Sequence, residues 1–153
     1  MLKFPLLHPE IIGALAGAGH GSRILIADGN YPFSTRCGPN AALVFLNLRP
    51  GLLSVTDVLS VLADAVPFES ATVMQPAKAG RYALKTDPDI FADFVAILGA
   101  KQSSWGGGKL ERLDRYKFYD AASAPDVCLT IATGEQRIYG NILLTIGVVR
   151  SVN

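Results

Sequence analysis

The stretch Gly17-Ala18-Gly19-His20-Gly21-Ser22-Arg23-Ile24-Leu25-Ile26-Ala27-Asp28 joins an expected helix to an expected buried strand. Before it, Pro9 opens a segment with apolar residues at helical spacing, and the glycines can supply the left-handed residue that ends a helix. The continuous apolar run over 24–27 is typical of a strand buried on both faces. Asp28 falls at the carboxyl end of that strand, where open α/β sheets place ligand sites. A histidine and a carboxylate are therefore held on one helix-turn-strand unit.

Further elements follow from apolar spacing and turn residues. Ser54 and Asp57 have the spacing of a capping box, which predicts a helix that ends before Pro67. Asp87 and Pro88 predict the start of another helix, which stops at Gly99, and a short helical turn is expected from Asp114. Strands are expected at 42–48, 71–74, 110–113, 127–132 and 142–146. This alternation predicts the α/β class, as a single three-layer α/β/α domain over residues 1–153 with a central mixed or mostly parallel sheet.

One glycine-rich loop leaves two interpretations open. Residues 103–108 place Trp105 beside three glycines, which predicts a mobile or a tightly turned segment. The loop could act as a lid over a site or serve as a plain connector.

Composition bounds the class of protein. Half of the 153 residues are hydrophobic, 18% are charged, and the mean hydropathy of +0.31 favours a protein whose apolar surface is covered by further subunits. A net charge of +1 argues against nucleic-acid binding. Two cysteines, Cys37 and Cys128, cannot make a disulfide framework, and they lack the Cys-x-x-Cys spacing of a metal or redox motif. No apolar segment has the length of a membrane span or of a leader, so a cytoplasmic protein without a membrane partner is expected.

Taken singly, the polar residues of this chain have ordinary explanations. A histidine in a glycine-flanked turn is more often a loop residue than a catalyst, and Asp28 at a strand end is usually a turn former. His8 and His20 do not have metal-ligand spacing, and no serine lies in a nucleophile elbow. Their joint order is more specific. From the N-terminus onward the chain contains His8-Pro9-Glu10, Gly19-His20-Gly21, Asp28, Arg115 through Tyr119, Thr133-Gly134-Glu135 and Tyr139-Gly140-Asn141.

In this ordered set the chain resembles the family of L-fucose mutarotases and D-ribose pyranases, with its RbsD-like fold, and it is closer to the fucose type. The resemblance implies an isomerase that interconverts the anomers of a monosaccharide by general acid/base ring opening and reclosure, without a cofactor or a metal. His20 would be the catalytic proton donor. The substrate-binding positions implied by the resemblance are Asp28, Arg115, Tyr139, Gly140 and Asn141. Relatives form rings of several subunits, so a decamer-like homo-oligomer with sites near subunit contacts is expected.

The chain departs from the family pattern at two positions. Fucose-type members usually carry an acid directly after Gly-His-Gly, where this chain has Ser22. A hydroxyl cannot stabilise an imidazolium as a carboxylate does. An alternative is therefore a protein that binds a monosaccharide without catalysis, linked to sugar uptake or regulation. Ribose-type members carry a second histidine where this chain offers Arg115, which favours the fucose type.

Overall fold

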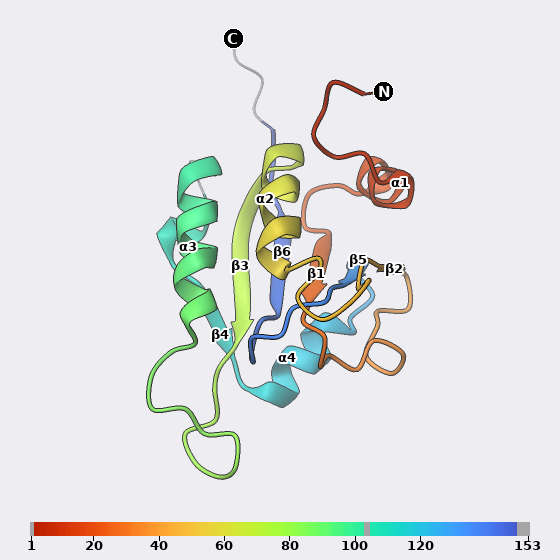
Figure 1. The fold of residues 1–153 in the computed structure, drawn as a ribbon. Coiled ribbons are helices and arrows are strands. Elements are labelled where there is room, and N and C mark those ends of the chain that lie inside the picture. Colours follow the sequence, from red (N-terminus) through yellow and green to blue (C-terminus); the bar gives the residue numbers. More distant parts are fainter. Residues whose placement is uncertain (1, 103–104, 150–153) are drawn as a thin grey trace.

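The computed structural model describes residues 2–102 and 105–149. Its six strands form one sheet in the order β2-β5-β1-β6-β3-β4 (Figure 1). Five strands run in the same direction, and β6 runs against its neighbours β1 and β3. The strands are β1 (Arg23–Ala27), β2 (Ala42–Phe45), β3 (Phe68–Met74), β4 (Glu111–Leu113), β5 (Val127–Ala132) and β6 (Ile142–Ile146). The sheet is thus mixed. The carboxyl ends of five strands and the amino end of β6 lie at the same end of the sheet.

Helices cover both faces of this sheet. Helices α2 (Val55–Ala65) and α3 (Asp89–Lys101) pack side by side on one face, and α1 (Pro9–Gly17) lies beside α2 (Figure 1). Helix α4 (Arg115–Ala122) lies on the other face. The loop after β1 contacts α4, since the rings of Tyr31 and Tyr119 meet edge to face at 5.7 Å. These layers confirm the predicted α/β class and its central mixed sheet.

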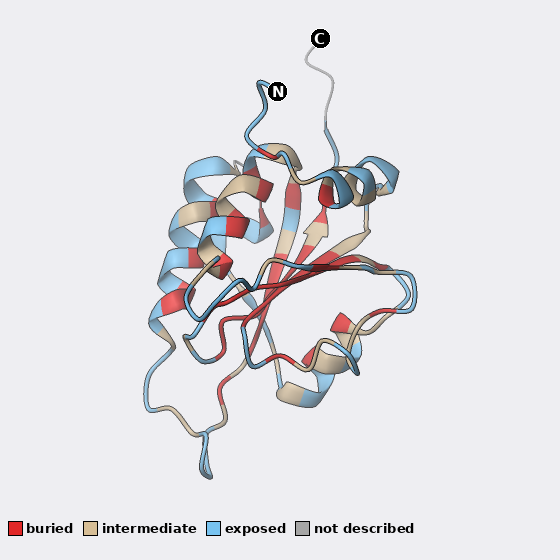
Figure 2. Cartoon of the chain, turned by 45° about the vertical axis from the view of Figure 1, so that its right-hand side comes forward, coloured by how far each residue is buried: buried red, intermediate tan, exposed pale blue. Residues whose placement is uncertain are grey.

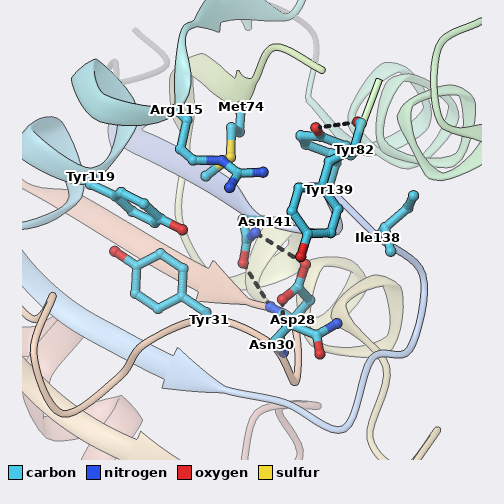
Figure 3. A pocket seen from close by; sticks show the side chains of 10 residues that line it. All are labelled: Asp28, Asn30, Tyr31, Met74, Tyr82, Arg115, Tyr119, Ile138, Tyr139 and Asn141. Atoms are coloured by element: carbon cyan, nitrogen blue, oxygen red, sulfur yellow. Dashed lines mark hydrogen bonds between the residues drawn. The ribbon is translucent and has the colours of Figure 1, made fainter. Parts of the chain in front are cut away.

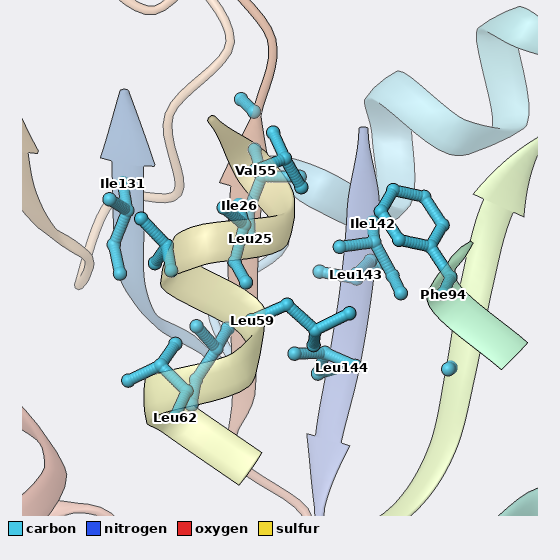
Figure 4. Packing of buried hydrophobic residues seen from close by; sticks show 14 of the residues in the cluster. Leu25, Ile26, Val55, Leu59, Leu62, Phe94, Ile131, Ile142, Leu143 and Leu144 are labelled. Carbon is cyan, nitrogen blue, oxygen red and sulfur yellow. The ribbon is translucent and has the colours of Figure 1, made fainter. Parts of the chain in front are cut away.

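The core lies between the sheet and the helices. Buried residues are concentrated on the central strands and on the sheet-facing sides of α2 and α3 (Figure 2). Leu59 and Leu62 of α2 and Phe94 of α3 are fully buried against the apolar side chains of β1, β5 and β6 (Figure 4). Burial of one such side chain contributes about 1.5–3 kcal/mol, so this face of the sheet is the rigid base on which the strand ends are held.

The opening helix-turn-strand unit forms as predicted, with one difference at the helix end. The residue after α1 is Ala18 in an extended conformation, and the left-handed residue is Gly21, at φ 82°. Gly21 donates its N–H to the carbonyl of Ile146, which ties the turn to the end of β6. The left-handed residue is therefore needed to enter the strand, not to stop the helix.

The bounds of three other elements differ from the prediction. The capping box of Ser54 and Asp57 is present as expected. Strand β2 is shorter than expected and mostly accessible, because it is an edge strand rather than a central one. Helix α3 starts after Pro88 without a side-chain cap, since Asp87 is paired with Arg112, and it continues past Gly99 to Lys101. Strand β3 begins three residues earlier than predicted, at Phe68.

The Trp105 loop is tightly turned where it is described. Residues 103 and 104 lie outside the described part of the chain, but Trp105 is buried and Gly106, Gly107 and Gly108 all have positive φ. This geometry fits a connector closed by a buried aromatic anchor. In the described part of the chain, no helix is long and apolar enough to span a membrane.

Candidate functional site

The site is built where the strand ends converge. In the β1–β6 ladder Ile26 lies opposite Ile142, so the residues that extend this register, Asp28 and residues 140–141, are neighbours. On the far side of β6, strand β3 ends at Met74, and β4 leads directly into α4, whose first residue is Arg115. The sheet topology thus brings together segments that are more than 100 residues apart in sequence.

A cavity of about 420 Å³ opens at this edge (Figure 3). This volume lies in the roughly 300–1,000 Å³ range typical of small-molecule sites. Four of the six residues predicted for the site line it together, which the resemblance alone could not establish. Its lining residues are Asp28, Asn30, Tyr31, Met74, Tyr82, Arg115, Tyr119, Ile138, Tyr139 and Asn141.

Asp28 is the most constrained polar group of the cavity. Its side chain accepts hydrogen bonds from the N–H of Asn30 and of Gly140, each at 3.0 Å, and from the Asn141 amide at 3.1 Å. The Asn141 oxygen in turn accepts the N–H of Asp28 at 2.8 Å. This reciprocal pair fixes both side chains, so the site is preorganised before any ligand binds.

Burial controls the ionisation of Asp28. The residue is 3% exposed. Desolvation raises the pKa of its carboxyl above the usual value, and the nearby charge of Glu135 adds to this, while the hydrogen bonds from Asn30, Gly140 and Asn141 oppose it. A carboxylate held in this way is suited to accept hydrogen bonds from ligand hydroxyls through its remaining lone pairs.

Arg115 supplies the positive charge of the cavity. It is the first residue of α4, whose N-cap, Asp114, accepts hydrogen bonds from the N–H groups of Tyr116 and Lys117. The guanidinium lies 5.5 Å from the ring centroid of Tyr82, a cation–π contact that holds it over the cavity. Figure 3 shows Tyr31 and Tyr119 on one side of the cavity and Tyr139 on the other, with the Arg115 guanidinium between them. A charged donor among aromatic faces is a suitable environment for a polyhydroxylated ring.

Tyr139 forms a wall of the cavity and connects it to the loop after β3. Its hydroxyl donates to the carbonyl of Tyr82 at 3.0 Å and accepts the N–H of Ala77 at 3.2 Å. Tyr139 has a positive φ of 60°, an unusual conformation for a non-glycine residue. Because the hydroxyl of Tyr139 already donates one hydrogen bond and accepts another, the ring is the part of the side chain that is left to contact a ligand.

Gly140 is needed for the close approach of the backbone to Asp28. A Cβ atom at this position would lie 2.9 Å from the carbonyl oxygen of Arg137 and 3.3 Å from the Cβ of Asp28. Gly140 itself does not line the cavity, and its contribution is the N–H that it donates to the carboxylate.

An ion pair behind the cavity fixes the loop before β6. Glu135 is buried and accepts two hydrogen bonds from the Arg137 side chain, at 2.8 and 3.0 Å, while Arg137 also contacts Asp93 of α3 at 2.6 Å. Although burial acts in the opposite direction, the hydrogen bonds from Arg137 lower the pKa of Glu135. The carbonyl of Glu135 accepts the N–H of Gly29. This network therefore holds the two loops that carry Asp28 and Asn141.

His20 lies at the opposite end of the strands, before the amino end of β1. It precedes β1 whereas Asp28 follows it, and the five residues of β1 alone span roughly 17 Å at about 3.3 Å per residue. The His20 side chain is 59% exposed, and its Nε2 lies 2.9 Å from Oε2 of Glu69. Within one chain, the structure does not bring His20 together with the cavity.

Several residues of these two regions were missed in the sequence. Tyr31, Met74, Tyr82 and Ile138 line the cavity, and Glu69 contacts His20. The carboxyl ends of the expected strands indicate Met74, but the position of Tyr82 depends on a loop without periodicity. Among residues 2–102 and 105–149, no group of three or more His, Cys, Asp and Glu side chains is arranged to hold a metal ion.

Fold and site together define a small α/β domain with a polar and aromatic cavity, of a size that suits a small molecule, at the carboxyl ends of its parallel strands. A family model described as the RbsD / FucU transport protein family matches residues 1–149. The chain belongs to this family, which confirms the prediction from the ordered motifs.

Similar proteins agree with this assignment. The fucose mutarotase of Homo sapiens is 29% identical over 150 residues, with 94% of this chain and 90% of that protein covered. The structure of Bacillus subtilis RbsD complexed with D-ribose is 27% identical and has a TM-score of 0.74, with 98% of this chain and 100% of that chain covered. The Streptococcus pneumoniae fucose mutarotase in complex with L-fucose, at 22% identity, shares the fold with a TM-score of 0.80, covering 98% of this chain and 100% of that chain.

Proposed function

We propose that this protein is a cofactor-independent monosaccharide mutarotase of the fucose type. The observation that carries the proposal is the cavity at the carboxyl edge, where Asp28, Arg115 and Asn141 converge in a chain whose family model covers residues 1–149. Relatives named fucose mutarotase and a relative complexed with D-ribose support a monosaccharide as the ligand.

The reaction needs groups that bind hydroxyls and one group that exchanges protons. Ring opening removes a proton from the anomeric hydroxyl and delivers one to the ring oxygen, and reclosure on either face reverses both transfers. Asp28 would accept from a sugar hydroxyl, while Arg115 and Asn141 would donate to sugar oxygens. A histidine is best matched to the proton exchange, because its unperturbed pKa of about 6.5 lies near neutrality.

We infer that His20 reaches the cavity of a neighbouring copy of the chain. Exposed apolar side chains lie at both ends of the strands: Val148 and Val149 follow β6 at the end where His20 lies, and Tyr82, Tyr116 and Ile138 line the cavity or lie next to its lining residues at the other end. Contacts of one end with the other are head to tail, and such contacts form a ring when the rotation between neighbouring copies closes. The proposal therefore includes a ring-shaped homo-oligomer, decamer-like as in the resemblance, with a cytoplasmic location.

Saturation-transfer NMR tests the activity directly. Equilibrated L-fucose, L-rhamnose, D-ribose and D-galactose are each measured with and without the protein, and transfer between the anomer signals is recorded. We expect faster exchange for at least one sugar, with L-fucose foremost. Unchanged exchange for all four sugars would contradict the proposal. Light scattering tests the assembly, and a monomer would contradict the ring.

A second candidate is a monosaccharide-binding protein without catalysis. The distance between His20 and the cavity within one chain favours it, as does Ser22 in place of the acid of fucose-type members. The same NMR experiment separates the two functions. Ligand signals that broaden or shift without faster anomer exchange would establish the binding protein.

A further inference from the structure

The loop between β3 and α3, residues 75–88, forms the rim of the cavity. It extends beyond the carboxyl end of β3 (Figure 1) and places Tyr82 in the cavity lining. Tyr82 is 58% exposed, whereas Asp28, in the same lining, is 3% exposed. The cavity therefore has a buried end at Asp28 and an open end at this rim.

Hydrogen bonds fix the rim in place. At the neck of the loop, Leu84 donates its N–H to the carbonyl of Ala77 at 3.2 Å. The Arg112 guanidinium closes the loop further on, where it donates to both carboxylate oxygens of Asp87 at 2.6 and 2.7 Å. The Tyr139 hydroxyl bonds to the backbone of both arms of the loop. The charges that the rim carries are thus held at defined positions beside the cavity.

The rim is basic. The loop carries Lys78, Arg81 and Lys85, all exposed, and its only acid, Asp87, is already paired. Arg115 adds a fourth positive charge from the start of α4. Within residues 2–102 and 105–149, none of these four cations has a carboxylate oxygen within 4.0 Å. Because the net charge of the whole chain is only +1, this excess of positive charge is local.

Two of the cations share one aromatic ring. The guanidinium carbons of Arg81 and Arg115 lie 5.6 and 5.5 Å from the centroid of the Tyr82 ring. Since both lie within 5.6 Å of one point, they are at most about 11 Å apart, comparable with the Debye length of about 8 Å at physiological ionic strength. Like charges at this distance repel, and an anion that contacts both would remove the repulsion. Guanidinium groups match the oxygens of carboxylates and phosphates.

A neighbouring copy of the chain does not offer such an anion readily. In the proposed ring, the cavity faces the end of a neighbour that carries His20. The acids that lie at that end of β3 and β5, Glu69 and Asp126, are paired within their own chain, with His20 and Arg23. A small anionic molecule is therefore the partner that these charges favour.

We propose that the rim binds the anionic substituent of a sugar, a carboxylate or a phosphate, through Arg81 and Arg115, so that uronic acids or sugar phosphates are ligands of the cavity in addition to neutral sugars. Conversion of such a sugar rests on the proposed mutarotase function, whereas its binding does not. The anionic group lies at the rim and the hydroxyls lie toward Asp28, because a second negative charge at the buried end would be repelled. The opposite charges at the two ends of the cavity thus orient the ligand.

Two series of sugars that differ only at C6 test the binding: D-galactose, D-galacturonate and D-galactose 6-phosphate, and the corresponding three D-gluco sugars. Isothermal titration with the full chain measures each affinity. In at least one series we expect an anionic member to bind about tenfold more tightly than the neutral member, as for hydrogen bonds between charged groups. We expect this preference to shrink in about 0.5 M NaCl, because salt screens it. Whether the uronate or the phosphate binds more tightly identifies the anionic group.

Arg81→Gln tests the rim itself. We expect the preference for the anionic sugar over the neutral one to fall by about tenfold, with the oligomeric state unchanged in light scattering. Lys109→Gln is the matched control. Lys109 is also exposed and has no carboxylate partner within the described residues, but it precedes β4 and so lies at the other end of the strands. It should keep the full preference.

The outcomes separate this inference from the proposed function. No tighter binding of an anionic sugar in either series, or an Arg81→Gln variant that keeps the preference, would overturn the rim site. An Arg81→Gln variant that dissociates into smaller species would also overturn it, because Arg81 would then serve contacts between copies. Saturation-transfer NMR is run on the same sugars. A protein that prefers anionic sugars but does not speed anomer exchange for any sugar would keep the rim site and overturn the proposed function.

Discussion

The two ends of β1 are built in opposite ways. At the carboxyl end, Asp28 is buried, and its carboxylate is held by three hydrogen bonds in a preformed cavity. At the amino end, His20 is exposed and has one side-chain partner, Glu69. The hydrogen bonds of Asp28 all come from the same chain, whereas the His20 side chain is exposed at the surface. Under the proposed function, binding is built within one chain, and proton exchange depends on contact between chains.

The largest effect is expected from the exposed end. His20→Ala should slow anomer exchange by about 10²- to 10⁴-fold, the usual contribution of a general acid/base, with a modest loss of sugar binding. Because the side chain is exposed, the free energy of unfolding should change by less than about 0.5 kcal/mol. Saturation-transfer NMR and urea unfolding measure the two quantities.

His8→Ala is the control for this variant, and it should keep the exchange rate. An active His20→Ala protein would remove the histidine from the mechanism and with it the functional contrast between the two ends.

At the buried end, the same kind of truncation should affect the fold as well. Asp28→Ala leaves the N–H groups of Asn30 and Gly140 and the Asn141 amide without their acceptor. We expect a loss of about 2–4 kcal/mol in the free energy of unfolding, together with loss of sugar binding. Asp126→Ala, at an exposed carboxylate, should cost less than about 1 kcal/mol in the same urea titration. Equal costs for the two variants would contradict the contrast in burial.

Arg115 should separate binding from stability at the cavity itself. Arg115→Leu removes the charged donor over the cavity but none of the hydrogen bonds that hold Asp28. Hydrogen bonds to a charged group contribute about 1.5–3 kcal/mol, so sugar affinity should fall by roughly 10- to 100-fold. Isothermal titration with the sugar selected by NMR measures the affinity. Unchanged affinity would place the sugar elsewhere.

The smallest effect concerns pH. Since the folded-state pKa of Glu135 is lowered, its contribution to stability is present above the unfolded value of about 4.3 and is lost as pH falls through the folded value. Asp28 acts in the opposite sense: its raised pKa makes stability decrease as pH rises from about 3.9 through the folded value.

Glu135→Gln isolates the first of these contributions. We expect a cost of about 1.5 kcal/mol at pH 7, at the low end for charged hydrogen bonds because Arg137 is partly exposed. At pH 3 the cost should be smaller. Urea unfolding at both pH values measures the difference, and an equal cost at both would show that the charge of Glu135 does not stabilise the loop.

The sequence was most informative where apolar runs and capping residues act locally. The strands over 24–27, 127–132 and 142–146 and the capping box of Ser54 formed as expected, since each depends on neighbouring residues. Strand β2 was predicted too long because the apolar pattern continues through Leu46 and Leu48, although both residues lie beyond the end of the strand. Pairing order decides which strand is at the edge, and this information is not local.

For the site, the ordered motifs named four residues that the structure brings together in one cavity, whereas His20 lies apart from that cavity within one chain. The sequence contained the reason, because residues on either side of a buried strand lie at opposite edges of the sheet. Glu69 gave no such signal. Its contact with His20 depends on a bulge in the pairing of β3 with β6, and a bulge follows from the register of two strands far apart in the chain.

The central claim, that one chain supplies His20 and its neighbour supplies the cavity, is tested most directly by mixing two inactive variants. His20→Ala keeps the cavity, whereas Arg115→Glu keeps His20 but places a second carboxylate in a cavity that already holds Asp28. After unfolding and refolding of an equal mixture, random assembly leaves about one quarter of the sites with both intact partners. The account predicts that anomer exchange returns to about a quarter of the wild-type rate. A mixture that assembles but stays as inactive as its two components would contradict it.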